Sequence, residues 1–141
     1  MILLDTDHFS VFTDERDARH ALLSRRMEAA EEQVACTIVS VEEVLRGWLA
    51  LIHRLRDVHR QIPAYTRLGQ LFDVLSDWEI VPFDEGAADR FAALRRQRIR
   101  IGTMDLKIAS IALVNDALLV TTNLRDYSLV PQLRCDDWLR P

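Results

Sequence analysis

Oxygen-bearing side chains recur at four places where short apolar runs give way to polar sequence. They are Asp5, Glu43, Asp105 and the pair Asn123 and Asp126. No His or Cys accompanies them, and hard oxygen ligands favour Mg²⁺ or Mn²⁺ over zinc. Carboxylates that lie close together repel one another unless a cation is bound between them. The chemistry open to this set is metal-assisted phosphoryl transfer, in which ions hold a phosphodiester and activate a water molecule.

The segments that must bring these residues together alternate between strand and helix. Strands are predicted for the continuously apolar or β-branched runs 1–4, 34–39, 80–83 and 118–122, with a possible edge near 133–138. Helices are predicted for the segments with apolar residues three and four apart, at about 15–32, 40–60, 63–75, 84–98 and 104–115. Pro63 is expected in the first turn of its helix, and Asp84 and Thr103 are expected as N-caps.

This alternation predicts an α/β fold. We expect a single domain over residues 1–141, with a mainly parallel central sheet and helices on both of its faces. In such a sheet the carboxyl ends of the strands meet at one edge, and ligands bind beyond that edge. The acidic residues follow strands or begin helices there, so the fold class predicts that they gather.

Each of these residues also has a structural explanation that needs no ligand. Asp5 could cap a turn, although an acid that ends a buried apolar run costs stability unless it is paired, which favours a functional role. Asp105 is favoured by the positive end of its predicted helix, and Asp126 suits a turn. For these two residues both explanations stay open. Lys107 is expected to pair with an acid.

Glu43 is equally open to two explanations. Ser40 and Glu43 match the S-x-x-E capping box, which alone would account for the glutamate. Gly47, one helical turn later, leaves open space beside Glu43, where Ala would favour the helix more. That space would suit the close approach of a ligand.

The composition excludes several classes of protein. The 141 residues are 49% apolar and 28% charged, and no stretch is long and apolar enough for a membrane span or a secretion signal. We expect a cytoplasmic globular protein in which Cys36 and Cys135 are buried, reduced thiols. The net charge of −4 argues against binding nucleic acid by bulk electrostatics. Any such contact needs a local cationic patch. Helical surface arginines are usually only solvated charge, which is the alternative explanation of the candidates here. They are Arg54, Arg56 and Arg60, and Arg95, Arg96, Arg98 and Arg100.

Four motifs together resemble the PIN domain family, and within it the VapC-type toxins of bacterial toxin–antitoxin pairs. The motifs are I-L-L-D-T-D at 2–7, I-V-S-V-E-E-V-L-R-G at 38–47, I-G-T-M-D-L-K-I-A at 101–109 and L-V-T-T-N-L-R-D-Y at 119–127. The resemblance spans the chain, and it implies that the family's acidic ligands fall on Asp5, Glu43 and Asp105. The fourth carboxylate falls on Asp126, where some members instead carry an Asp at the position of Asn123. Thr6 and Asn123 then have supporting roles.

The resemblance also implies an activity and partners. These are endonucleolytic cleavage of RNA that depends on Mg²⁺, for which Mn²⁺ can substitute, a homodimer, and inhibition by a cognate antitoxin protein. None of them follows from composition or spacing.

Two other functions fit parts of this pattern. In a haloacid-dehalogenase-like phosphatase, Asp5 would be the nucleophile and Asp7 the general acid, but the later Lys and acid pair are absent in the required order and Glu43 has no role. A non-catalytic PIN-like scaffold is the second alternative. The acids retained at the three principal positions argue against it.

Overall fold

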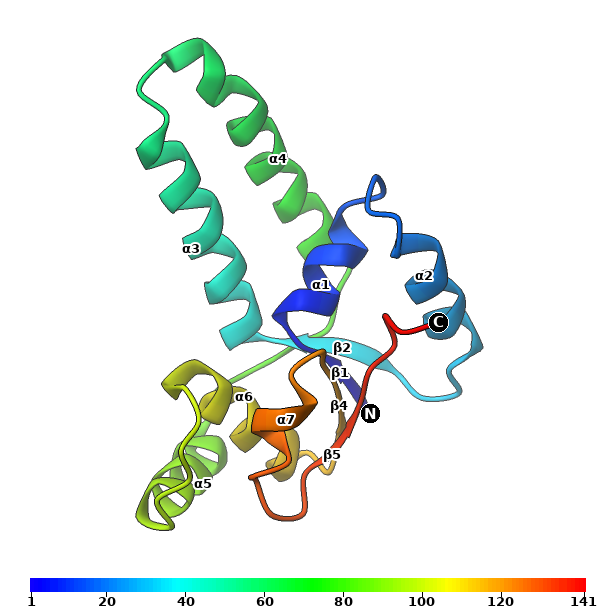
Figure 1. Ribbon diagram of the computed structural model, residues 1–141, viewed down its shortest axis with the longest axis vertical. Helices are drawn as coiled ribbons and strands as arrows, with labels where there is room; N and C mark the ends of the chain where they lie inside the picture. The colour runs from blue at the N-terminus through cyan, green and yellow to red at the C-terminus, as the bar shows by residue number, and fades with distance from the viewer.

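The computed structural model describes residues 1–141 and consists of five strands and seven helices (Figure 1). The strands are β1 (Ile2–Leu4), β2 (Val34–Thr37), β3 (Ile80–Val81), β4 (Leu118–Val120) and β5 (Arg134–Asp136). The helices are α1 (Thr6–Thr13), α2 (His20–Ala29), α3 (Ile38–Arg54), α4 (Val58–Ser76), α5 (Glu85–Arg96), α6 (Thr103–Val114) and α7 (Leu124–Tyr127).

The five strands form one parallel sheet in the order β3-β2-β1-β4-β5. The central strand β1 is aligned so that Leu4 lies opposite Cys36 of β2 and Val120 of β4. Because all the strands run in one direction, their carboxyl ends share one edge. The predicted parallel α/β fold is confirmed, and so is the edge strand near the C-terminus.

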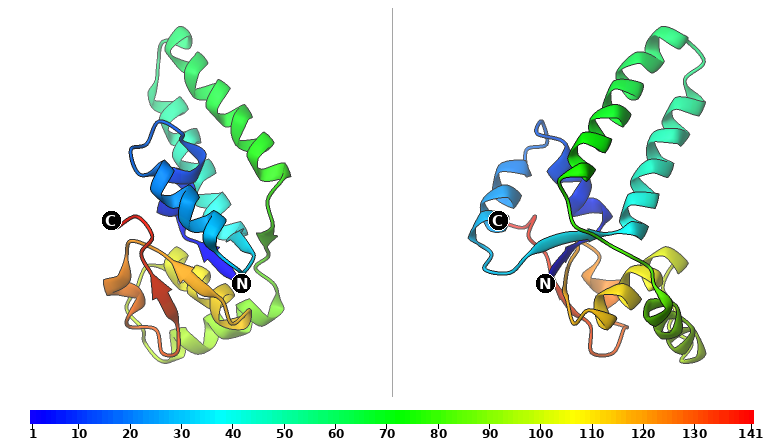
Figure 2. Two further views of the ribbon diagram at one scale, coloured as in Figure 1. Left: turned by 90° about the vertical axis from the view of Figure 1, so that its right-hand side faces the viewer. Right: turned by 180° about the vertical axis from the view of Figure 1, so that it is seen from behind.

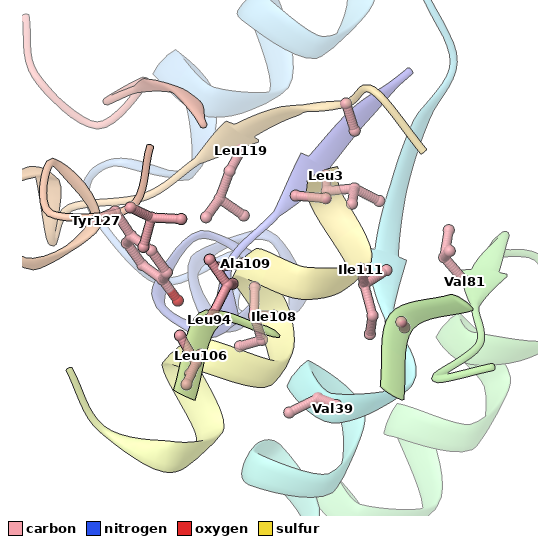
Figure 3. Packing of buried hydrophobic residues seen from close by; sticks show 14 of the residues in the cluster. Leu3, Val39, Val81, Leu94, Leu106, Ile108, Ala109, Ile111, Leu119 and Tyr127 are labelled. Atoms are coloured by element: carbon pink, nitrogen blue, oxygen red, sulfur yellow. The ribbon is translucent and has the colours of Figure 1, made fainter. Parts of the chain in front are cut away.

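The sheet buries both of its faces, because alternate residues of each strand point in opposite directions. Leu3 and Leu119 pack with α5 and α6 in the larger apolar cluster, which Figure 3 shows from close by. Ile2 and Leu4 pack on the opposite face with Phe9 of α1 and with apolar residues of α3 and α4. The two further views in Figure 2 follow the helices that cover these faces.

Helices α3 and α4 form a hairpin that projects away from the sheet (Figure 1). The apolar pattern predicts one helix to about residue 60, but α3 ends at Arg54 and α4 begins at Val58. The reason is local capping, because Asp57 accepts a hydrogen bond from the backbone N–H of His59. Pro63 consequently lies inside α4, and the prediction that it lies in the first turn of its helix is wrong.

The N-terminal helices also differ from the prediction. Residues 6–13, for which the sequence predicts no helix, form α1, whose N-cap is Asp5 and whose residues Phe9 and Val11 are buried. This helix is too short to show a clear apolar period in the sequence. Helix α2 begins at His20, later than expected.

The remaining helix starts are closer to the prediction. Asp84 caps α5 as expected, since its side chain accepts a hydrogen bond from the backbone N–H of Ala87. Helix α6 begins at Thr103 with Gly102 at its N-cap, so the predicted cap at Thr103 is wrong by one residue.

Neither cysteine forms a disulfide. Cys36 is fully buried and Cys135 is partly buried, and burial raises the pKa of Cys36 to about 12 and that of Cys135 to about 11. Both thiols therefore stay protonated at neutral pH. None of the helices combines the length and the apolar character needed to span a bilayer.

The C-terminal residues are bound to α1 by a buried histidine and to α2 by an arginine. His8 is fully buried, and its Nε2 accepts a hydrogen bond of 3.1 Å from the backbone N–H of Trp138 and lies 3.4 Å from Oδ1 of Asp137. Arg26 donates to the carbonyl oxygens of Asp137 and Arg140. Burial lowers the pKa of His8 below 6.5, so its ring is neutral at pH 7 and can accept this bond.

We predict that the His8→Phe substitution flattens the pH dependence of stability. His8 binds a proton more readily in the unfolded chain than in the folded chain, because folding lowers its pKa below 6.5. The wild type therefore loses stability as the pH falls from 7 to 5. The variant should be less stable by about 1–2 kcal/mol at pH 8, where it lacks the hydrogen bond. Urea denaturation of both proteins at several pH values measures this. A difference that does not shrink toward pH 5 would contradict the prediction.

Candidate active site

The structure brings the predicted acidic residues together at the carboxyl edge of the sheet. Asp5 follows β1, Glu43 lies on α3 after β2, and Asp105 lies in the first turn of α6. Burial raises the pKa of Asp5 and of Glu43, and the negative charge of Asp105 raises both further, so the three carboxylates lie near one another. The expected gathering of side chains from distant segments is therefore present.

Asp5 is the buried centre of this group. It is 5% exposed, and its carboxylate accepts hydrogen bonds of 2.7 Å from the backbone N–H of Thr6 and 2.7 Å from Oγ1 of Thr121. Burial is the main reason that the pKa of Asp5 rises to about 6, since it disfavours the charged form, and the two hydrogen bonds offset part of this effect. An isolated carboxylate here is costly at neutral pH.

Glu43 is held by Thr6 and takes no part in a capping box. The hydroxyl of Thr6 donates a 2.6 Å hydrogen bond to Oε1 of Glu43. The N-cap of α3 is Thr37, whose side chain accepts a hydrogen bond of 3.0 Å from the backbone N–H of Ser40. Helix α3 begins before Ser40, so the capping-box explanation of Glu43 is wrong. Partial burial raises the pKa of Glu43.

Asp105 lies between two donors from the segment after β4. The hydroxyl of Tyr127 is 3.3 Å from Oδ1 of Asp105, and Nδ2 of Asn123 is 3.5 Å from its Oδ2. Burial raises the pKa of Asp105, and the neighbouring charge of Asp126 raises it further. The acid is therefore more than a favourable charge at a helix N-terminus.

Asn123 links the two acids that were considered with it. Its Nδ2 also donates a 3.1 Å hydrogen bond to Oδ2 of Asp126, so the amide nitrogen lies between Asp126 and Asp105. Its backbone N–H donates to Oγ1 of Thr121, which in turn donates to Asp5. Asn123 therefore connects both halves of the acidic group.

Several neighbouring charges lie outside this group. Glu42 forms a surface ion pair with Arg46. Asp7 is exposed and accepts a hydrogen bond from the hydroxyl of Thr122. The ammonium of Lys107 lies 5.9 Å from the centre of the Phe83 ring and forms no ion pair, so its predicted pairing with an acid is wrong.

Two residues that hold the acids were not singled out from the sequence for this role. Thr121 and Tyr127 are both fully buried, and their hydroxyls contact Asp5 and Asp105. A buried hydroxyl usually needs a hydrogen-bond partner, so a threonine that ends a buried strand and a tyrosine in the next turn are recognisable signals.

The donor set fits a divalent cation that keeps part of its hydration shell. All candidate ligands are oxygen atoms, and crowding or burial raises the pKa of Asp5, Glu43 and Asp105. No three Asp, Glu, His or Cys side chains are arranged so that they could hold an ion by themselves. Mg²⁺ is usually bound through one or two carboxylates together with waters and substrate phosphates, so a smaller protein ligand set is sufficient.

We predict that Asp5→Asn stabilises the fold when divalent ions are absent. The pKa of Asp5 rises from 3.8 to about 6 on folding, so its ionisation destabilises the folded chain above about pH 6 and not below about pH 4. At pH 8 the variant should gain about 1–3 kcal/mol in the free energy of unfolding. Urea denaturation in EDTA at pH 4 and 8 tests this, with Asp89→Asn, on the exposed surface of α5, as the control. A less stable Asp5→Asn protein at pH 8 would refute it.

Comparison with solved structures relates this architecture to known proteins. The chain is similar to a chain of VapBC2 from Rickettsia felis bound to a promoter DNA fragment, with a TM-score of 0.75 and 22% identity over 98% of this chain and 99% of that chain. It is similar to FitAcB from Neisseria gonorrhoeae, with a TM-score of 0.75 and 21% identity over 100% of both chains. It is also similar to VapBC-5 of Mycobacterium tuberculosis, a member of the VapBC family of toxin-antitoxin systems. That comparison has a TM-score of 0.62 and 27% identity over 96% of this chain and 97% of that chain.

Sequence comparison gives the family. No curated protein matches the chain significantly. The model of the PIN domain matches residues 2–131, which is nearly the whole chain. The parallel sheet and the acidic edge agree with the four motifs from which the resemblance was inferred. This chain belongs to the PIN domain family.

Proposed function

We propose that this protein is an endoribonuclease dependent on Mg²⁺ or Mn²⁺, and the toxin of a VapBC-type pair. The observation that carries the proposal is that Asp5, Glu43 and Asp105, from three distant segments, lie at one edge of the sheet. Hydrogen bonds through Thr6, Thr121 and Asn123 connect them. PIN domain toxins are nucleases, and the family assignment supports that coarser activity.

The electrostatics of the site support a cation. Burial raises the pKa values of Asp5, Glu43 and Asp105, and the charges of neighbouring acids raise them further. Asp5, Glu43, Asp105 and Asp126 would hold the ion or ions, with the carbonyl of Asn123 in support. A bound divalent ion would stabilise charge on the phosphate and lower the pKa of the attacking water.

The remaining polar residues would orient the ligands. Thr6 fixes the carboxylate of Glu43, Thr121 fixes that of Asp5, and Tyr127 fixes that of Asp105. Outer partners of this kind typically change metal affinity or activity by 10- to 100-fold when they are removed. The backbone N–H groups at the start of α6 lie next to Asp105 and would favour a phosphate there.

The proposed partners are RNA as substrate, a cognate antitoxin protein and a second copy of this chain. Several similar structures are VapBC or toxin–antitoxin complexes, which supports an antitoxin. An apolar groove bordered by Ile38, Leu49 and Phe83 offers a contact surface for the homodimer. The cytoplasmic location expected from the sequence stays a prediction.

The phosphatase alternative has lost its support. It left Glu43 without a role, whereas Glu43 is hydrogen-bonded to Thr6 directly after Asp5. Its proposed general acid, Asp7, is exposed and bonded to Thr122. Membership of the PIN domain family favours phosphodiester cleavage. RNA cleavage by the purified protein distinguishes the nuclease from the scaffold alternative.

We predict that Glu43→Gln and Asp105→Asn each slow RNA cleavage by more than about 100-fold, because both remove a proposed metal ligand. Mixed cellular RNA is incubated with purified protein and Mg²⁺ or Mn²⁺, and discrete products should vanish in EDTA. Glu42→Gln is the matched control, since Glu42 is adjacent but pairs with Arg46 on the surface. Its rate should stay near that of the wild type.

The same proteins give a readout that does not depend on cleavage. Mg²⁺ should raise the Tm of the wild type and of Glu42→Gln more than that of Glu43→Gln. Intact RNA from folded, antitoxin-free wild type, with no Mg²⁺-dependent shift in Tm, would reject the nuclease and favour the scaffold.

A further inference from the structure

A polar groove leads away from the acidic group between α1 and the hairpin of α3 and α4. It encloses about 560 Å³, and Thr6 and Glu43 line it, so it is continuous with the candidate active site. Three arginines also line it, namely Arg16, Arg54 and Arg67. We propose that this groove binds single-stranded RNA on one side of the scissile phosphate and that Arg54 contacts the RNA backbone. This inference rests on the proposed nuclease function.

The charge of the groove is the first support. The chain carries a net charge of −4, so an RNA strand needs a local cationic surface to approach the acids. Asp14 accepts a 3.2 Å hydrogen bond from Nε of Arg16 and lies 3.5 Å from an Arg67 nitrogen, so one acid offsets part of two cations. Arg54 forms no ion pair or hydrogen bond through its side chain and is exposed, so its full charge is available to a phosphate.

The second support is a flat cationic surface in the wall of the groove. The guanidinium carbon of Arg67 lies 5.2 Å from the centre of the Trp48 ring, and Arg67 is 24% exposed. Unpaired bases stack on aromatic rings and on arginine planes, whichever base is present. The groove therefore offers both backbone contacts and stacking, which together are typical of single-strand binding.

The third support is the open space at Gly47, one turn from Glu43. A Cβ atom at Gly47 would meet no heavy atom within 4 Å, so packing does not require a glycine here. Glycine inside a helix is nevertheless disfavoured relative to alanine. Its absence of a side chain keeps the groove wide beside the proposed metal ligand.

The test measures RNA binding in EDTA, where cleavage is blocked. A fluorescent single-stranded RNA of roughly ten nucleotides is titrated with wild type, Arg54→Ala and Arg25→Ala, and anisotropy is followed at several salt concentrations. Arg25 is the matched control, since it is an exposed, unpaired helical arginine outside the groove. Arg54→Ala should weaken binding about 10-fold and reduce the slope of log K against log salt by about 0.7, with little change for Arg25→Ala.

A second pair of variants tests the space in the groove. Gly47→Leu should fill the space and weaken RNA binding strongly, whereas Gly47→Ala should weaken it less, with both proteins folded by circular dichroism. In cleavage assays Arg54→Ala should raise KM and leave kcat close to that of the wild type.

The outcomes separate this inference from the nuclease proposal. Equal RNA affinity and salt dependence for Arg54→Ala and Arg25→Ala, or no RNA binding by the wild type, would overturn the inference and leave the groove to a protein partner. A clear effect of Arg54→Ala on binding, with no cleavage by the wild type, would retain the RNA groove and reject the nuclease.

Discussion

The central strand of this protein leads directly into a buried carboxylate, and much of the structure follows from the need to accommodate it. Asp5 continues the pairing of β1, because its backbone N–H donates to Val120 of β4, and its side chain caps α1. The sheet therefore fixes the carboxylate in place before any ligand binds. Thr121, at the end of the neighbouring strand, supplies the hydrogen bond that partly offsets the cost of burial.

The other acids are positioned by elements anchored to the same sheet. Helix α3 follows β2 without a loop and carries Glu43 past Thr6, while α6 packs in the larger apolar cluster with Asp105 in its first turn. The site is thus built from strands and helices, and Asn123 lies between β4 and α7 as the N-cap of that helix. A preorganised group of this kind holds ligands in place at little entropic cost.

The parallel sheet, and the position of the acidic residues at its carboxyl edge, could be predicted from the sequence, because buried parallel strands are continuously apolar and their ends share an edge. The sequence was insufficient where a contact joins distant side chains. The bond from Thr6 to Glu43, which replaces the expected capping box, depends on the exact crossing of α1 and α3. Helix α1 was not predicted, because a helix of eight residues is too short to show a clear period of apolar residues. The break at Asp57 was hidden by an apolar pattern that continues through the hairpin.

Helix α3 is one uninterrupted rod that carries Glu43 near its start and Arg54 as its last residue. Arg54 lies eleven positions after Glu43, which corresponds to roughly 16 Å along a helix axis at 1.5 Å per residue. Under the proposed function, α3 therefore fixes the distance between the phosphate that would be cut and the point where Arg54 would contact the strand. A nuclease with this distance fixed would select RNA by the length of unpaired strand beside the cut as much as by the identity of its bases.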